Sequence, residues 1–146
     1  MDLMISMQDL TALHIAAAMG HSDVVRTLLA AGANPSLAGH GGWLPLHYAA
    51  FGGHAAAAHL LLAAAPHTAV THDSLQGITP CHLAAQHGKA AVVRLILDAA
   101  PQAALMKTWH GSTPLHMAAE HGHDKAVREG RAAPGLQAAS CPEWQK

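Results

Sequence analysis

The chain of 146 residues has little charge and few aromatic side chains. Charged residues make up 12% of it, against about 25% in average proteins, and aromatic residues only 3%. The eight Lys and Arg are balanced by nine Asp and Glu, so the net charge is −1 with His neutral. The basic residues are scattered along the chain and form no cluster that would bind a phosphate backbone. We therefore expect no nucleic-acid partner.

The sequence also lacks a long apolar segment and a cysteine framework. The apolar stretch Ala55 to Ala65 is too short to cross a membrane and is interrupted by His59. Residues Met1 to Ile5 lack the positive charge and the apolar core of a secretory signal. The two cysteines, Cys81 and Cys141, lie in unlike contexts, so we expect no disulfide between them. These absences predict no membrane contact and an intracellular, most simply cytoplasmic, location.

What the sequence does contain is one stretch repeated four times. Gly111 to His123 reads Gly-Ser-Thr-Pro-Leu-His-Met-Ala-Ala-Glu-His-Gly-His, and Gly77 to Lys89 repeats it closely. Two more copies include Leu44 to His54 and Thr11 to His21. The equivalent positions lie 33, 35 and 34 residues apart, which is the period of a stacked repeat array; they are Thr11, Leu44, Thr79 and Thr113.

Each unit predicts a pair of helices. In the last copy, Thr113 can accept a hydrogen bond from the first turn, and Pro114 follows where no N–H is needed, so an inner helix begins there. Gly122 stands where a left-handed residue would end that helix. A second apolar period follows, clearest in residues 92–97, and predicts an outer helix. The stretches between units, such as residues 71–77, carry turn formers and predict projecting loops.

The combination Thr-Pro-Leu-His-x-Ala-Ala-x-x-Gly-His, Val-Val-x-Leu-Leu-Leu and Gly-Ala-Asn resembles the ankyrin repeat over roughly residues 7–128. The resemblance implies an all-α solenoid of stacked helix-turn-helix units with projecting loops or short β-hairpins. It also implies a protein-binding scaffold without chemistry of its own, so we expect neither an enzyme nor a cofactor. The alternative is the substrate-targeting segment of a larger enzyme, such as a kinase, ubiquitin ligase or acyltransferase, whose catalytic domain is absent from this sequence.

The repeats predict one ankyrin domain over residues 1–129 and a flexible tail over residues 130–146. The units cover about 6–38, 39–72, 73–107 and a truncated 108–129. The fourth unit departs from the pattern because Glu129, Gly130 and Arg131 stand where the second has three leucines. Repeat arrays need a polar cap at each end, so either the chain is a fragment of a longer protein or the tail folds back over this face. We expect a monomer, with weak self-association through that end as the alternative.

Fourteen histidines raise the question of a metal or catalytic site. Four of them recur at one motif position, and the resemblance implies that they hydrogen-bond to the neighbouring unit; these are His14, His47, His82 and His116. If those bonds hold the rings neutral, stability should decline as the pH drops through about 6. No His-Glu-x-x-His motif and no paired cysteines at ligand spacing are present, so we predict no metal site. A Zn²⁺ between His87 and His121 is the weaker alternative.

Cys81 and His82 are adjacent in the sequence, which suggests a nucleophile and its base, but this adjacency does not bring their side chains together. Adjacent residues of a helix point about 100° apart, and Cys81 takes the place of a core leucine in the motif. We therefore expect a buried thiol and no catalytic residue.

The resemblance implies that partners contact the loop tips and two places late in each inner helix, which together line a concave face. In this sequence those places hold Met19, His40, Trp43, Phe51, Leu75, Gln76, Ile78, Gln86, His87, Trp109, His110, Ser112, Glu120 and His121. Two of the three Trp and the single Phe fall among them. Because aromatic residues anchor protein interfaces out of proportion to their frequency, we predict a binding site for another protein. The alternative is that Trp43 and Trp109 pack against neighbouring loops.

Overall fold

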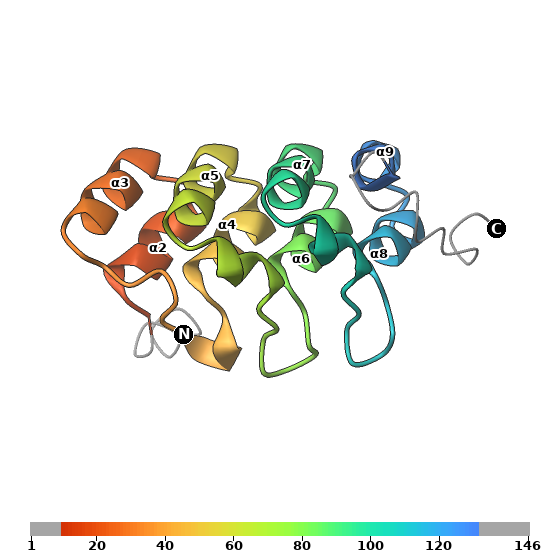
Figure 1. Ribbon diagram of the computed structural model, residues 1–146, viewed down its shortest axis with the longest axis horizontal. Helices are drawn as coiled ribbons and strands as arrows, with labels where there is room; N and C mark the ends of the chain where they lie inside the picture. Colours follow the sequence, from red (N-terminus) through yellow and green to blue (C-terminus); the bar gives the residue numbers. More distant parts are fainter. Residues whose placement is uncertain (1–9, 132–146) are drawn as a thin grey trace.

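The computed structural model describes residues 10–131, which form two parallel rows of helices (Figure 1). The inner row consists of α2 (Ala12–Met19), α4 (Pro45–Gly52), α6 (Pro80–Gln86) and α8 (Pro114–Glu120). The outer row consists of α3 (Ser22–Ala30), α5 (Ala55–Ala64), α7 (Ala90–Ala99) and α9 (Asp124–Arg131). Each helix packs against its partner in the hairpin and against the equivalent helices of adjacent units. The predicted all-α solenoid is confirmed, with loops and no β-strand over residues 10–131.

The inner helices begin and end where the motif predicts. Thr11, Thr79 and Thr113 stand in extended conformation before the first turn, and each side-chain oxygen accepts a hydrogen bond from the backbone N–H three residues on. Leu44 takes this place in the second unit without a side-chain cap, a loss that typically costs about 1 kcal/mol. Gly20 and Gly53 end α2 and α4 with φ of 77° and 73°, the left-handed region that glycine enters without steric cost.

Two short 3₁₀ helices follow the outer helices of the middle units, and the periodicity did not predict them. They are η2 (Pro66–Val70) and η3 (Pro101–Leu105), and each starts with a proline that cannot continue the α-helix. In η2, the hydroxyl of Thr68 donates to the carbonyl oxygen of Ala65 at 2.6 Å, and both side chains are buried. These connections are therefore part of the packed structure. A third such turn, η1 (His40–Gly42), lies in the loop before α4.

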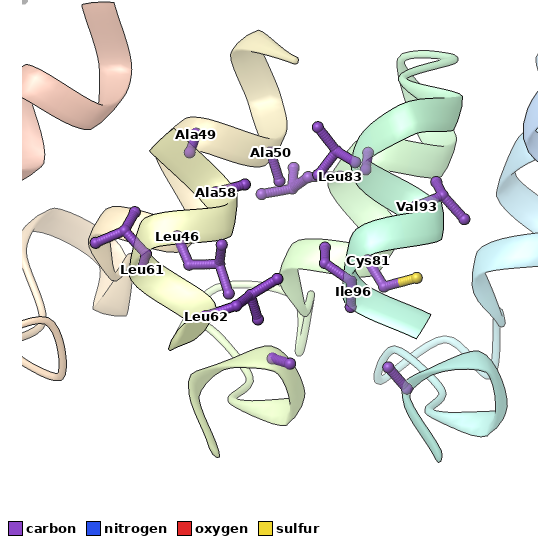
Figure 2. Close-up of a cluster of buried hydrophobic side chains, with 14 of the residues drawn as sticks. Leu46, Ala49, Ala50, Ala58, Leu61, Leu62, Cys81, Leu83, Val93 and Ile96 are labelled. Atoms are coloured by element: carbon purple, nitrogen blue, oxygen red, sulfur yellow. The ribbon is translucent and has the colours of Figure 1, made fainter. Parts of the chain in front are cut away.

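The core is one continuous cluster that runs through all four units and is rich in alanine. Figure 2 shows its middle part, where Leu46 and Leu62 of the second unit lie near Cys81 and Ile96 of the third. Fully buried alanines, such as Ala58, stand between the larger side chains and allow the two rows of helices to approach closely. Cys81 occupies the position of a core leucine, as the sequence predicts.

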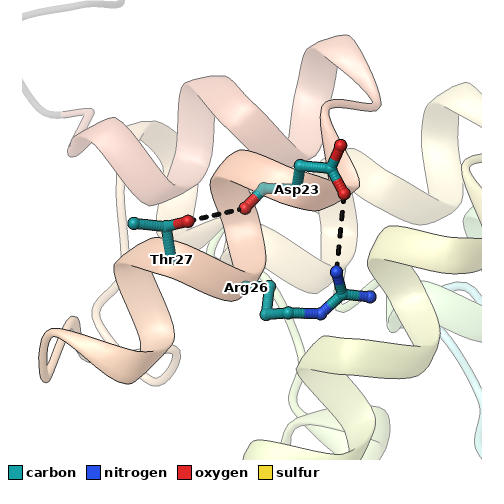
Figure 3. Close-up of polar contacts among 3 residues, drawn as sticks. All are labelled: Asp23, Arg26 and Thr27. Carbon is teal, nitrogen blue, oxygen red and sulfur yellow. Dashed lines mark hydrogen bonds and ion pairs between the residues drawn. The ribbon is translucent and has the colours of Figure 1, made fainter.

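The outer helix of the first unit, α3, buries fewer side chains than α5 and α7. Of its side chains only Val25 is fully buried. Thr27, which replaces the leucine of other units, is exposed, and its hydroxyl donates to the carbonyl oxygen of Asp23 at 3.0 Å (Figure 3). The adjacent ion pair between Arg26 and Asp23 spans 3.5 Å with both side chains exposed, so it contributes little stability.

The last outer helix corrects the predicted boundary of the fourth unit. The sequence assigns residues from Gly130 onward to the tail, whereas α9 continues through Arg131. Gly130 is buried, and a Cβ at this position would lie 2.8 Å from Leu115, so glycine allows α9 to pack directly on α8. The rest of the predicted tail, including Cys141, lies outside the described residues.

Candidate functional site

Three loops project from the stack in front of α4, α6 and α8, and we call them fingers: residues 39–43, 73–78 and 108–112 (Figure 1). Each finger is closed at its base by a backbone hydrogen bond: Gly39 to Trp43 at 2.8 Å, Asp73 to Ile78 at 2.8 Å, and Thr108 to Ser112 at 2.9 Å. Backbone N–H groups of each later finger also donate to the preceding one, Ser74 to Gly41 and Trp109 to Gln76. The fingers thus form a continuous hydrogen-bonded layer beside the inner helices.

A row of buried histidines ties the inner helices to these fingers. The Nδ1 atoms of His14, His47 and His82 accept backbone N–H bonds from their own helix caps at 3.1, 3.0 and 3.2 Å. Nδ1 therefore carries no proton, and Nε2–H donates to a carbonyl of the next finger. Those carbonyls belong to Trp43, Ile78 and Ser112, at 3.1, 3.0 and 2.9 Å. The predicted bridge to the neighbouring unit is present at these three positions.

The same arrangement holds these rings neutral. Burial lowers the pKa of His47 and His82 to about 4, although the hydrogen bonds to Ile78 and Ser112 act in the opposite direction. Burial likewise lowers the pKa of His14. These histidines are committed to the scaffold and are not available to bind a partner.

Trp43, like the buried histidines, makes contacts that hold neighbouring units together: its side chain connects the first two fingers. Its indole N–H donates to Oδ2 of Asp73 at 2.9 Å, and its ring stacks on His47 with centroids 5.8 Å apart. Oδ1 of Asp73 accepts the backbone N–H groups of Gln76 and Ile78, both at 3.0 Å. Burial alone would raise the pKa of Asp73, but these three hydrogen bonds and the nearby His47 lower it below its usual value. The main contacts of Trp43 are therefore those of the alternative in which its ring packs against a neighbouring loop.

Other large apolar side chains at the predicted positions remain exposed. Met19, Leu75 and Trp109 each keep 63% of their surface exposed, and Phe51 keeps 48%. The Trp109 ring covers the backbone of Gly77, where a Cβ would meet it at 2.5 Å, so one side of the ring packs and the rest faces solvent. We call the surface formed by the inner-helix ends and the fingers the concave face; these four side chains are its apolar part.

The concave face also carries a group of cation-forming side chains beside Phe51. The ring of His87 lies 4.6 Å from that of Phe51, and the rings of His121 and His123 stack in parallel 6.2 Å apart. Burial is the largest cause of the lowered pKa of His87, and repulsion from Lys89, His121 and His123 lowers this pKa further. We call His87, Lys89, His121 and His123 the basic cluster.

The predicted partner residues are distributed unevenly between surface and core. Exposed side chains belong to Met19, His40, Phe51, Leu75, Gln76, His87, Trp109, His110, Glu120 and His121, and Trp43, Gln86 and Ser112 are partly buried. Ile78 corrects the prediction: it is only 6% exposed, because its side chain turns into the core while its carbonyl binds His47. The prediction missed Tyr48, whose ring lies 5.0 Å from Trp43, and Lys89 of the basic cluster. Tyr48 is the single tyrosine of the chain, and that rarity was the available signal.

A catalytic role for Cys81 is not supported by its surroundings. The side chain is fully buried, and burial raises the pKa of its thiol to about 12, which leaves almost no thiolate at neutral pH. The two ring nitrogens of His82 are engaged by Thr79 and Ser112. Over residues 10–131, no three His, Cys, Asp or Glu side chains gather closely enough to hold a metal ion. Within that same span, no helix has both the length and the apolar character needed to cross a bilayer.

One pocket lies away from the concave face, between the outer helices α5 and α7. It has a volume of about 450 Å³ and is lined mainly by aliphatic side chains, with His59 and Asp98 as its polar members.

Comparison with known proteins agrees with this architecture. A family model described as ankyrin repeats (3 copies) matches residues 2–71 and 65–129. The chain belongs to the ankyrin repeat family. Ankyrin repeats generally act as protein–protein interaction modules, which supports a binding role and a non-catalytic one.

The curated relatives share only part of one repeat array with this chain. It is 42% identical over 52 residues to Protein phosphatase 1 regulatory subunit 12A of Mus musculus, and equally to that of Rattus norvegicus. The aligned stretch covers 36% of this chain and 5% of each relative. This ankyrin chain therefore resembles a small portion of those proteins, and the rest of each relative has no counterpart in the comparison.

Proposed function

We propose that this chain is a non-enzymatic interaction scaffold that binds a partner protein on its concave face. The supporting observation is the position of its exposed large apolar side chains. Of the seven among residues 10–131, four lie on the concave face: Met19, Phe51, Leu75 and Trp109. Exposed apolar side chains on a rigid surface favour association with a partner, since their burial stabilises a complex without reorganising the fold.

The rigidity of the fingers strengthens this proposal. The backbone of Trp109 donates to Gln76 of the preceding finger, and Leu75 lies between Ser74 and Gln76, which both take part in such finger-to-finger bonds. Little conformational freedom is therefore lost when a partner covers Leu75 and Trp109. Trp109 combines a large ring with an exposed surface, the properties of residues that dominate binding energy in protein interfaces.

The proposal is tested by comparing partner capture by matched surface variants. Leu75→Ser and Trp109→Ala should weaken binding of any captured protein by about tenfold or more, whereas Val24→Ser, an equally simple change of an exposed apolar residue on α3, should leave it unchanged. Urea denaturation of each variant verifies that the fold is retained. A partner captured equally well by all three variants would contradict the concave face as the binding site.

A second candidate is a substrate-targeting segment of a larger enzyme or enzyme complex. It is favoured by one observation, that the matched relatives are regulatory subunits of a phosphatase. Both candidates use the concave face for binding. They differ in whether the chain acts alone or is joined to the catalytic part of an enzyme. The apparent mass of the endogenous protein on an immunoblot, compared with the 15.1 kDa of this chain, distinguishes the two.

A further inference from the structure

The inner-helix ends of the concave face change character along the stack. The fifth residue after the motif histidine is Met19 in the first unit, Gly52 in the second, His87 in the third and His121 in the fourth. The preceding position holds the ring of Phe51 in the second unit, and this ring reaches His87 of the third. The face therefore carries apolar side chains over the first two units and imidazole rings over the last two.

The basic cluster is held in place by the helix-ending glycines. The stem of Lys89 lies over Gly53, and the ring of His123 lies over Gly88, at positions where a Cβ would come within 2.6 Å of each. His121 donates from Nδ1 to the carbonyl oxygen of Met117 at 2.9 Å, because a carbonyl can only accept. The four side chains are thus anchored individually.

Among the described residues, no acidic side chain counters the repulsion that lowers the pKa of His87. From α8 the exposed Glu120 is the nearest acidic residue in sequence, and at the start of α9 Asp124 is paired with Arg128 at 2.8 Å. α4 contributes Phe51, which has no charge, and α7 begins directly after Lys89. Each neighbouring charge that acts on His87 comes from a cation-forming group, so a bound anion would favour the charged form of its ring.

We propose that the concave face binds an extended acidic peptide segment, with apolar side chains against Met19 and Phe51 and carboxylates within the basic cluster. This proposal rests on the proposed function and specifies the chemistry of its partner. Adjacent packed helices lie about 8–10 Å apart, and an extended chain advances about 3.3–3.6 Å per residue, so one unit corresponds to about three residues of peptide. The carboxylates should therefore lie about three to six positions from the apolar side chains, in whichever direction the segment runs.

Binding of such a segment should take up protons. A carboxylate bound near His87 stabilises the charged form of its imidazole and so raises the pKa of His87 on binding. By linkage, affinity must increase as the pH falls toward the range in which histidine titrates. Between about pH 7.5 and pH 6, uptake of a substantial fraction of one proton corresponds to about a three- to tenfold gain in affinity.

The test is a selection of random twelve-residue peptides displayed on phage, carried out against the folded chain at about pH 6. We expect the selected peptides to be enriched in Asp and Glu, placed about three to six positions from an apolar residue. Calorimetry on synthetic versions should show binding about tenfold weaker for the double variant His87→Gln with His121→Gln. Val24→Ser should bind them as the unmodified chain does, and replacing their carboxylates by amides should remove the pH dependence.

The outcomes separate this proposal from the one on which it rests. Selected peptides that lack acidic enrichment, but still lose affinity on Phe51→Ser, would overturn the acidic segment and leave the concave face as the binding site. Peptides whose affinity is indifferent to Phe51→Ser and Trp109→Ala would overturn both proposals. A selection that yields no binder would overturn the extended peptide and leave only a folded partner for the concave face.

Discussion

Acidification should unfold this protein through the histidines that join its units. His47 and His82 are fully buried, and their pKa of about 4 in the folded protein compares with about 6.5 in the unfolded chain. Since the folded pKa is the lower one, this contribution to stability is complete above about pH 6.5 and is lost as the pH falls toward 4. The loss amounts to about 2 kcal/mol per histidine at about pH 5, and about 4 kcal/mol for both.

That loss is large beside the total stability of a domain, which is about 5–15 kcal/mol. The melting temperature should therefore be lower by about 10 °C or more at pH 5 than at pH 7.5. Urea denaturation at both values gives the free energy of unfolding directly, with the slope m as a check that the same surface is exposed. His14 adds to the effect in the same direction, because burial lowers its pKa too.

Two variants assign the effect to the buried rings. His82→Gln should be less stable at pH 7.5, yet it should lose about 2 kcal/mol less on acidification than the unmodified chain. His14→Gln in the first unit serves the same purpose if the first variant does not fold. His59→Gln changes an exposed residue of α5 and should keep the full loss. Equal stabilities at the two pH values, or an unchanged loss in His82→Gln, would refute the reasoning.

Two further predictions concern the finger contact and the buried thiol. Trp43→Phe removes the indole donor from the buried carboxylate of Asp73 and should cost about 1–3 kcal/mol in urea denaturation. Trp109→Phe, at an exposed ring, should cost less than about 1 kcal/mol, so equal costs would contradict their different roles. In a Cys141→Ser chain, Cys81 should not react with a thiol reagent until urea unfolds the protein, because it is fully buried with a pKa of about 12. A rapid reaction of the native chain would contradict that burial.

The sequence predicts the helices well because their ends depend on local chemistry. A threonine cap and a terminal glycine act within a few residues, so each copy of the motif reports its own helix boundaries. Agreement between four copies then reduces the chance of error at any one. The second unit lacks the threonine cap, yet α4 begins at the same position, because Leu44 is buried and His47 still accepts its N–H.

The sequence predicts less where a residue's role depends on another unit. The motif position of Ile78 does not reveal that its side chain enters the core, since this follows from the turn of the finger closed by Asp73. The role of Trp43 depends on the same carboxylate, thirty positions further along the chain. The helical character of Gly130 is likewise set by its contact with Leu115 rather than by its propensity. In each of these cases the role of the residue is determined by a contact with another part of the fold, which the local sequence pattern does not contain.

Protonation affects the buried scaffold histidines and the proposed anion site in opposite ways. His82 must be neutral, because its Nδ1 accepts a backbone N–H, whereas a carboxylate bound beside His87 would raise the pKa of that exposed ring. Acidification therefore favours anion binding by the basic cluster and opposes folding at the same time. At about pH 6 the protonation of His47 and His82 together costs only about 2 kcal/mol, so the folded state persists at the pH of the binding test. Acid can therefore strengthen binding without unfolding the repeats only in the first part of the interval between about pH 6.5 and the pKa of about 4 of His47 and His82, before their loss of stability becomes large.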